Sequence, residues 1–333
     1  MLTIDDVRQA VRTIHGKVHR TPVLTCRALD DLAGASFFFK CENFQKVGAF
    51  KARGATNAVF SLNDDDAGKG VATHSSGNHA QALALAARQR GIPAYVVMPT
   101  SAPEVKRRAV AGYGAEIIDC APTLAAREST LDSVVARTGA HFVHPYDNPL
   151  IIAGQGTAAL ELLEEVPDLD IIMAPVGGGG LLAGTALATA ALAPNARIVA
   201  GEPAGADDAA RSLLAGKVIP SVNPRTIADG LLTSLGRLNF PIIQNHVEAI
   251  WTVDDPAIAA AMRLVWERMK IIIEPSSAVP LAAALAHQGE IAGCRVGVIF
   301  SGGNVDLDRL PWQAPGLSAP ARGHLTGTTQ EQR

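Results

Sequence analysis

Lys51 is the residue with the clearest chemical potential in this chain of 333 residues. It stands between Phe50 and Ala52 in the segment FQKVGAFKARGA, among small and apolar side chains. A lysine in apolar, partly buried surroundings has a lowered pKa and can form a Schiff base with an aldehyde. An exposed lysine at a helix start would look the same in sequence, and on the local pattern alone that interpretation is the commoner one.

Four consecutive glycines, 177–180, follow an apolar run and precede an Ala- and Leu-rich segment. A glycine loop between a strand and a helix exposes backbone N–H groups at a positive helix terminus, which suits a phosphate. The spacing is neither the dinucleotide fingerprint nor the ATP-type loop. A tight turn that lets the helix pack on the strand explains the motif about equally well.

Three further segments place polar side chains near the ends of apolar runs. HSSGNHAQ (74–81) could bind a carboxylate or a ring substituent, or could simply cap a helix. A Ser–His–acid triad is disfavoured there because no G-x-S-x-G elbow is present. SGGNVD (301–306) could contact a ligand or only form a turn, and the acids of GEPAGADDA (201–209) could bind Mg²⁺ or Ca²⁺ or favour a helix N-terminus.

The elements that must position these segments alternate along the chain. Apolar, β-branched runs are separated by helical segments, which predicts an α/β fold with parallel sheets covered on both faces. In such folds ligands bind beyond the carboxyl ends of the strands, where the polar segments fall. The predicted strands are 93–99, 115–120, 140–145, 171–176, 197–203 and 295–304.

Composition limits the class of protein. The chain is 48% hydrophobic and 18% charged, which excludes a mostly disordered protein, and its length favours two domains. The net charge of −3 argues against a nucleic-acid partner. The four cysteines lack zinc-site spacing and predict reduced thiols in a cytoplasmic protein, and the N-terminus predicts an amphipathic helix rather than a signal peptide.

One uncharged stretch, 171–193, is long enough to span a bilayer. It contains Pro175 and the four glycines, which are costly in a helix interior. We therefore expect a buried strand, a loop and a helix starting near Leu181, and no membrane partner.

Taken together and in this order, the motifs resemble the fold-type II pyridoxal-phosphate enzymes, specifically the serine/threonine dehydratase and serine racemase group. The likeness runs from HRTPVLT (19–25) to SGGNVDL (301–307). It includes KCENFQKVGAFKARGA, HSSGNHAQALALAA, AGQGTAALE, PVGGGGLLAG, EPAGADDA, IADGL, VWERMK and IIIEPSSAV.

The resemblance implies roles for individual residues. Lys51 would carry pyridoxal phosphate as a Schiff base and act as the base at Cα, and Ser76 would be a second base on the opposite face. Phe50 would pack on the cofactor ring, Asn78 would bind its hydroxyl and Ser301 would face its nitrogen. The remaining roles would fall to a phosphate loop (Gly177, Gly178, Gly179, Gly180 and Leu181), a substrate site (Ser75, Ser76, Asn78, His79 and Arg127) and a divalent-cation site (Glu202, the carbonyl of Ala206, and Asp208).

The activity implied is elimination of water from L-threonine or L-serine, giving a 2-oxo acid and ammonia. The alternatives are a serine racemase, or a dehydratase for another β-hydroxy amino acid such as hydroxyaspartate or phenylserine. Departures from the group keep these open: KVGAFK replaces the usual K-T-G-S-F-K, and Tyr146 stands in HPYDN. A non-catalytic small-molecule binding protein is disfavoured because it has no need of a Schiff-base lysine.

The architecture implied is two domains of the tryptophan synthase β-like type, each an open and mostly parallel sheet flanked by helices. Residues 1–47 and 147–313 would form the large domain that binds the cofactor. Residues 48–146 would form a small mobile domain carrying the lysine and the substrate loop, and 314–333 a flexible tail. A homodimer is also expected.

Overall fold

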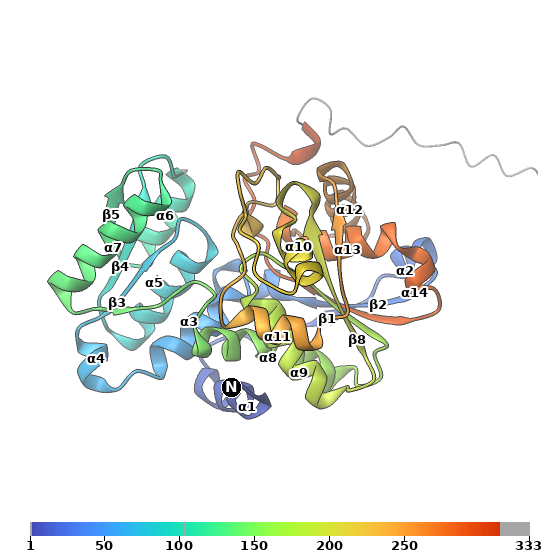
Figure 1. Cartoon of the computed structure of the whole chain (residues 1–333), viewed down its shortest axis with the longest axis horizontal. Helices are drawn as coiled ribbons and strands as arrows, with labels where there is room; N and C mark the ends of the chain where they lie inside the picture. Colours follow the sequence, from blue (N-terminus) through green and yellow to red (C-terminus); the bar gives the residue numbers. More distant parts are fainter. Residues whose placement is uncertain (1, 103, 314–333) are drawn as a thin grey trace, which may run out of the picture.

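The computed structural model describes residues 2–102 and 104–313 and divides them between two sheets. Figure 1 shows a body built on the smaller sheet at the left and a body built on the larger sheet at the right. The α/β fold class, with mostly parallel sheets flanked by helices, is thus confirmed. The tail predicted at 314–333 lies outside the described residues.

The larger sheet has six strands in the order β1-β2-β10-β7-β8-β9. Every neighbouring pair is parallel except β1 with β2. The last strand of the chain, β10, lies in the middle of this sheet, between β2 and β7. The strands are β1 (Val23–Leu24), β2 (Ser36–Cys41), β7 (Ile171–Pro175), β8 (Arg197–Pro203), β9 (Ala249–Val253) and β10 (Arg295–Phe300).

Helices cover both faces of this sheet, as apolar parallel strands require. On one face the core is formed with α2 (Arg27–Ala33), α12 (Asp255–Met269) and α13 (Pro275–Ala286). On the other face it is formed with α1 (Ile4–Ile14), α8 (Pro149–Glu165), α9 (Gly180–Leu192) and α11 (Asn239–His246). The shorter α10 (Asp208–Ala215) and α14 (Gln288–Ile291) complete this body.

The smaller sheet has four parallel strands in the order β5-β4-β3-β6. These are β3 (Val71–His74), β4 (Ala94–Pro99), β5 (Glu116–Cys120) and β6 (His141–Phe142). Its helices are α4 (Asp64–Gly68), α5 (Asn78–Arg90), α6 (Glu104–Gly112) and α7 (Leu124–Thr138). One further helix, α3 (Lys51–Phe60), lies where the two bodies meet (Figure 1).

The uncharged stretch at 171–193 divides as predicted into β7, the glycine loop and α9, which begins at Gly180. No helix among residues 2–102 and 104–313 is both long and apolar enough to cross a membrane. The strand predicted at 140–145 was too long. It is reduced to β6, and the chain then leaves the sheet, so that His144, Pro145 and Tyr146 face the region where the bodies meet.

Candidate active site

The predicted segments converge at the carboxyl ends of β3, β7 and β10. Lys51 is the first residue of α3, and the backbone just before it is attached to the end of β10. The Phe50 N–H donates to the Ser301 carbonyl at 2.9 Å, and Ala49 forms an isolated bridge with Gly302. Residues separated by about 250 positions in sequence therefore fix the start of the lysine helix.

The Lys51 side chain is partly buried. Its Nζ donates to the Pro145 carbonyl at 2.8 Å and lies 5.1 Å from the centre of the Phe50 ring. Burial lowers the pKa of Lys51 to about 8, although the nearby Glu274 carboxylate acts in the opposite direction. A substantial neutral fraction is thus present in mildly alkaline solution, as a nucleophilic lysine requires.

The glycine loop has no room for side chains. A Cβ on Gly178 would lie 2.3 Å from the ring of Tyr146, and one on Gly177 would lie 2.9 Å from Leu231. Gly179 has a φ of 89°, in the left-handed region. Glycine is therefore needed here for two reasons, close packing and backbone conformation.

The loop also ends in a helix terminus without a side-chain cap. The first N–H groups of any helix have no intrahelical acceptor, and here they belong to Gly180 and Leu181 at the end of α9 that faces the loop. Unpaired N–H groups and the helix dipole favour an anion at this end. The geometry of this cradle fits a phosphate.

The polar loop after β3 contributes the start of α5, whose first residue is Asn78. The His79 ring is buried and its Nε2 lies 3.2 Å from the Val143 carbonyl, so that Nε2 carries the hydrogen and the buried Nδ1 has no partner. Burial keeps the pKa of His79 well below its ordinary value. A neutral ring means that an anion held at this loop, by Ser75 and Ser76 among others, would be bound mainly by hydroxyl and backbone N–H donors.

Arg127 lies on α7, near the other side of this loop, close enough to His74 and Cys120 to influence their ionisation. Its Nε is buried and has no hydrogen-bond partner. An unused donor on a permanent cation fits a carboxylate ligand.

Glu274 is a site residue that sequence reasoning missed. Its carboxylate accepts hydrogen bonds from Asn78 Nδ2 at 3.0 and 3.2 Å and from the Asn304 N–H at 3.0 Å. Asn304 Nδ2 in turn donates to Asn78 Oδ1 at 2.9 Å, which fixes the orientation of the Asn78 amide. Burial raises the pKa of Glu274 to about 7. A carboxylate directly before a proline, after three isoleucines, was the available signal.

His144 and Tyr146 were also not assigned roles. His144 Nδ1 accepts the N–H groups of Tyr146 and Asp147 at 3.3 and 2.9 Å, so that its hydrogen lies on Nε2. Burial lowers the pKa of His144 to about 4 and keeps the ring neutral. Their position beside Pro145 makes both residues part of the wall around Lys51.

Two of the predicted cation ligands, Glu202 and Asp208, lie near one another, at the end of β8 and the start of α10. Glu202 accepts the N–H groups of Ala209 and Ala210, each at 2.8 Å, and Asp208 is buried with neither carboxylate oxygen hydrogen-bonded. Burial raises the pKa of Glu202 to about 8 and that of Asp208 to about 6. The carboxylate of Asp208, which has no hydrogen-bond donor, fits a bound cation, although residues 2–102 and 104–313 contain no cluster of three or more His, Cys, Asp or Glu side chains able to hold a metal.

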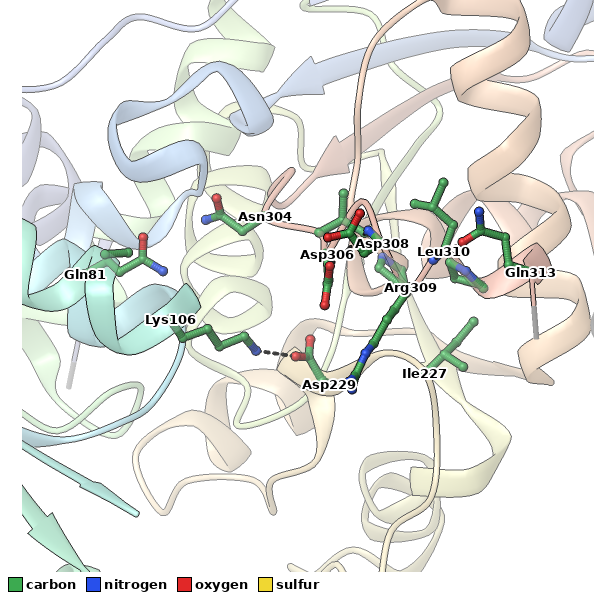
Figure 2. A pocket seen from close by; sticks show the side chains of 14 residues that line it. Gln81, Lys106, Ile227, Asp229, Asn304, Asp306, Asp308, Arg309, Leu310 and Gln313 are labelled. Atoms are coloured by element: carbon green, nitrogen blue, oxygen red, sulfur yellow. Dashed lines mark hydrogen bonds and ion pairs between the residues drawn. The ribbon is translucent and has the colours of Figure 1, made fainter. Parts of the chain in front are cut away.

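A cavity of about 690 Å³ opens between the two bodies, beside Asn304. Figure 2 shows Gln81 and Lys106 on its small-body side and Asp229 and Arg309 on the other. Lys106 Nζ and Asp229 Oδ2 form an ion pair of 2.5 Å across it. This pair joins α6 to the short 3₁₀ helix η4 (Asp229–Leu231) and thereby links the two bodies.

Comparison with known proteins agrees with this geometry. A family model described as "Pyridoxal-phosphate dependent enzyme" matches residues 14–302. The beta-hydroxyaspartate dehydratase of Paracoccus denitrificans is 54% identical over 310 residues, which cover 93% of this chain and 98% of that protein. The crystal structure of serine racemase from Dictyostelium discoideum has a TM-score of 0.89 at 51% identity, covering 92% of this chain and 99% of that one. The crystal structure of the T.th. threonine deaminase has a TM-score of 0.88 at 44% identity, with coverage of 92% and 99%.

Proposed function

Because the chain belongs to the pyridoxal-phosphate dependent enzymes, among dehydratases and racemases, we propose that it eliminates water from β-hydroxyaspartate. Loss of water leaves an enamine, and addition of water to the C=N bond of its imine tautomer gives a 2-oxo dicarboxylic acid and ammonia. The similarity to the Paracoccus dehydratase, at 54% identity over nearly the full length of both chains, carries the choice of substrate. L-Threonine or L-serine is the first expectation from the sequence, and the proposed substrate is instead one of the alternatives, hydroxyaspartate.

The site has a group to match each reactive part of pyridoxal phosphate. The Lys51 amine suits the aldehyde, and the glycine cradle at 177–180 suits the phosphate. Asn78, bonded to Glu274, and Ser301, whose carbonyl accepts the Phe50 N–H, are polar residues of the same region that suit the ring substituents. When bound, the cofactor withdraws electrons from the Cα of an amino acid and so weakens the Cα–H bond.

Proton removal from Cα falls to Lys51 Nζ. With a pKa of about 8, the amine is basic enough to accept a proton and is partly neutral at the working pH. Neutral His79 and His144 add no competing positive charge near it. We assign the substrate α-carboxylate to the hydroxyl and N–H donors of Ser75, Ser76 and the start of α5.

A dicarboxylic substrate needs a second anion-binding group. We assign this role to Arg127, whose buried Nε has no hydrogen-bond partner. Serine and threonine lack a distal carboxylate and would leave this donor unused. Burying an unpaired cation donor is costly, which favours the dicarboxylic substrate over its smaller analogues.

The test is a substrate panel on the purified, cofactor-loaded protein. 2-Oxo acid formation is measured with the stereoisomers of 3-hydroxyaspartate and with L-serine, D-serine, L-threonine and phenylserine. We expect kcat/KM for one 3-hydroxyaspartate isomer to exceed that for L-serine at least tenfold. Lys51→Ala should lose both the visible absorbance and the activity, whereas the matched control Lys46→Ala should keep the absorbance.

The outcomes separate the parts of the proposal. A colourless wild-type protein that takes up no added pyridoxal phosphate would refute the whole assignment. A coloured protein that prefers serine or threonine would refute only the substrate. Arg127→Met should raise KM for hydroxyaspartate much more than KM for L-serine, and equal effects would remove Arg127 from the distal carboxylate.

Serine racemase is the second candidate, supported by 50% identity to the Dictyostelium serine racemase over 93% of this chain. Inversion at Cα needs a second base on the face opposite Lys51, and Ser76 is the residue we propose for it. Chiral analysis of serine remaining after incubation measures this activity. Ser76→Ala should abolish inversion and spare dehydration of L-substrates, and equal loss of both would contradict the assignment.

We propose a divalent cation at Glu202, the Ala206 carbonyl and Asp208. The support is the buried pair of carboxylates, one of which has both oxygens without a hydrogen-bond donor. A cation there would offset their mutual repulsion and the cost of burying them.

We also propose that the protein forms a homodimer. Phe44 and Ile272 are 45% and 46% exposed, and the Asn43 side chain donates to the Ile272 carbonyl at 3.1 Å, so the two apolar side chains belong to adjacent segments. Sedimentation of wild type and of Phe44→Glu tests this. A monomeric wild-type protein would refute the dimer.

A further inference from the structure

A cluster of charged side chains is buried two residues beyond Lys51. The guanidinium of Arg53 forms paired hydrogen bonds with Glu42, at 2.7 and 2.8 Å, and with Glu161, both at 2.8 Å. Its Nη1 also donates to Thr157 Oγ1 at 3.1 Å. Lys40 Nζ donates to Glu161 at 2.7 Å, so that two cations and two carboxylates form one neutral group.

This cluster is almost fully enclosed, with Glu161 the most exposed member at 9%. Arg53, Lys40 and Glu42 are each 0% exposed. Burial alone would lower the pKa of Arg53, but Glu42 and Glu161 more than offset this and hold it above its ordinary value. Every N–H of the guanidinium has an acceptor, so the side chain has one arrangement that satisfies it.

All of the partners of Arg53 lie outside the segment that carries it. Glu42 belongs to the 3₁₀ helix η1 (Glu42–Phe44), and Thr157 and Glu161 belong to α8. The same face of α3 meets α8 without intervening side chains: a Cβ on Gly154 would lie 2.6 Å from the Gly54 Cα. The first turns of α3 are thus fastened to the large body by charge and by backbone contact.

Lys51 and Arg53 face opposite ways on this helix, because two residues correspond to about 200° of rotation. The Lys51 side chain reaches the Pro145 carbonyl, while the Arg53 side chain enters the space between η1 and α8. A rotation of α3 about its axis that breaks the cluster therefore moves the amine in the opposite direction.

We propose that Arg53 is a positioning residue for Lys51, and that its double carboxylate clamp holds the lysine amine in place and away from water. The inference rests on the proposed role of Lys51. The hydrophobic contacts between α3 and α5 involve mainly alanines on both helices. Alanine side chains are too short to interdigitate deeply, so these contacts constrain the rotation of α3 about its axis only weakly. On the opposite side of α3, the paired hydrogen bonds of Arg53 with Glu42 and Glu161 have a defined geometry and can fix that rotation.

The experiment measures the Lys51 amine in the cofactor-free protein. Limiting formaldehyde and a borohydride reductant methylate neutral amines, and peptide mass analysis gives the extent at Lys51 from pH 6 to 11. In the wild type the midpoint should lie near pH 8. In Arg53→Met/Glu42→Gln, which removes one charge of each sign, water reaches the amine and the midpoint should rise by at least one pH unit.

Further variants keep the test valid whether or not the double variant folds, as judged by thermal unfolding. Arg53→Lys keeps the charge but cannot grip both carboxylates, and Thr157→Val removes only one hydrogen bond; each should raise the midpoint by a smaller amount. The matched control Arg20→Met breaks the half-exposed pair with Glu164, also on α8, and should not change it. Folded variants with the wild-type midpoint would overturn the proposal.

The result is independent of the proposed function. If the wild-type protein takes up no pyridoxal phosphate, the function is refuted while the labelling midpoints still report on Arg53. Conversely, a coloured wild type with unchanged midpoints in every folded Arg53 variant would refute the positioning role alone.

Discussion

Glu274→Gln is the perturbation that best tests the electrostatics of the site. The Glu274 residue is 5% exposed, and burial raises the pKa of its carboxyl group from 4.5 to about 7 in the folded protein. In the unfolded chain the same group ionises near its ordinary value. Between these two pH values the folded state therefore holds a proton that the unfolded state has lost.

The sign and size of the effect follow from linkage. Because the folded protein binds the extra proton, raising the pH through this window weakens the folded state. A difference of about 2.5 pKa units corresponds to about 3 kcal/mol, at 1.36 kcal/mol per unit. A glutamine at this position cannot titrate, so the variant lacks this penalty, although its amide leaves one hydrogen bond to Asn78 or Asn304 unsatisfied at every pH.

The assay is urea unfolding of the cofactor-free protein from pH 4 to pH 8. The free energy of unfolding of wild type minus that of Glu274→Gln should fall by about 3 kcal/mol across this range. The exposed Glu165→Gln is the control and should show no such trend. Parallel curves for wild type and Glu274→Gln would show that Glu274 ionises normally and would refute the reasoning. The variant should also lower the labelling midpoint of Lys51, because Glu274 supports the charge of that amine.

Three further predictions concern the rest of the site. Gly178→Ala places a Cβ 2.3 Å from the Tyr146 ring and should weaken pyridoxal-phosphate binding at least tenfold by fluorescence titration; adding Tyr146→Ala should recover part of it, and no recovery would place the clash elsewhere. Chelation should lower the melting temperature of the wild type, and Mg²⁺, Mn²⁺ or Ca²⁺ should restore it. The melting temperature of Asp208→Asn should change with neither the chelator nor the added cation. A wild type that does not respond to the chelator would refute the proposed cation site. Lys106→Met breaks the ion pair with Asp229 between the bodies. The Lys106 side chain is partly exposed, so the free energy of unfolding should change by less than about 1 kcal/mol. If the pair favours closure of the two bodies, the KM for substrate should rise, and an unchanged KM would exclude that role.

Much of the fold could be predicted because its signals are local. Strands β4, β5, β7, β8 and β10 are apolar runs between helical segments, and the glycine loop is recognisable from four letters. Strands β1, β2, β3 and β9 were missed. β2 (SFFFKC) contains Lys40 next to its last residue, and the burial of this lysine depends on Glu161, far away in the sequence. β3 has only four residues, and its strand character comes from two parallel neighbours.

The site was predictable where chemistry depends on residue type and not where it depends on packing. Lys51 and Asn78 could be singled out by their residue types and motifs, and the structure brings them to one region together with Ser301. Glu274 could not be, because an isolated glutamate gains its raised pKa only from the burial that α13 and the Asn304 loop create. The two carboxylates around Arg53 are 119 positions apart in the chain, and no spacing rule connects them.

The central place of β10 has a consequence for how this protein is made. β2, β7 and β8 leave the ribosome long before β10, which must enter between β2 and β7. Until Phe300 has been synthesised, the larger sheet exists as two separate edges, and the anchor for Phe50 at Ser301 is missing. The four-stranded sheet, complete by residue 142, meets no such delay. The nascent chain therefore carries Lys51 for most of translation without the surroundings that lower the pKa of its amine.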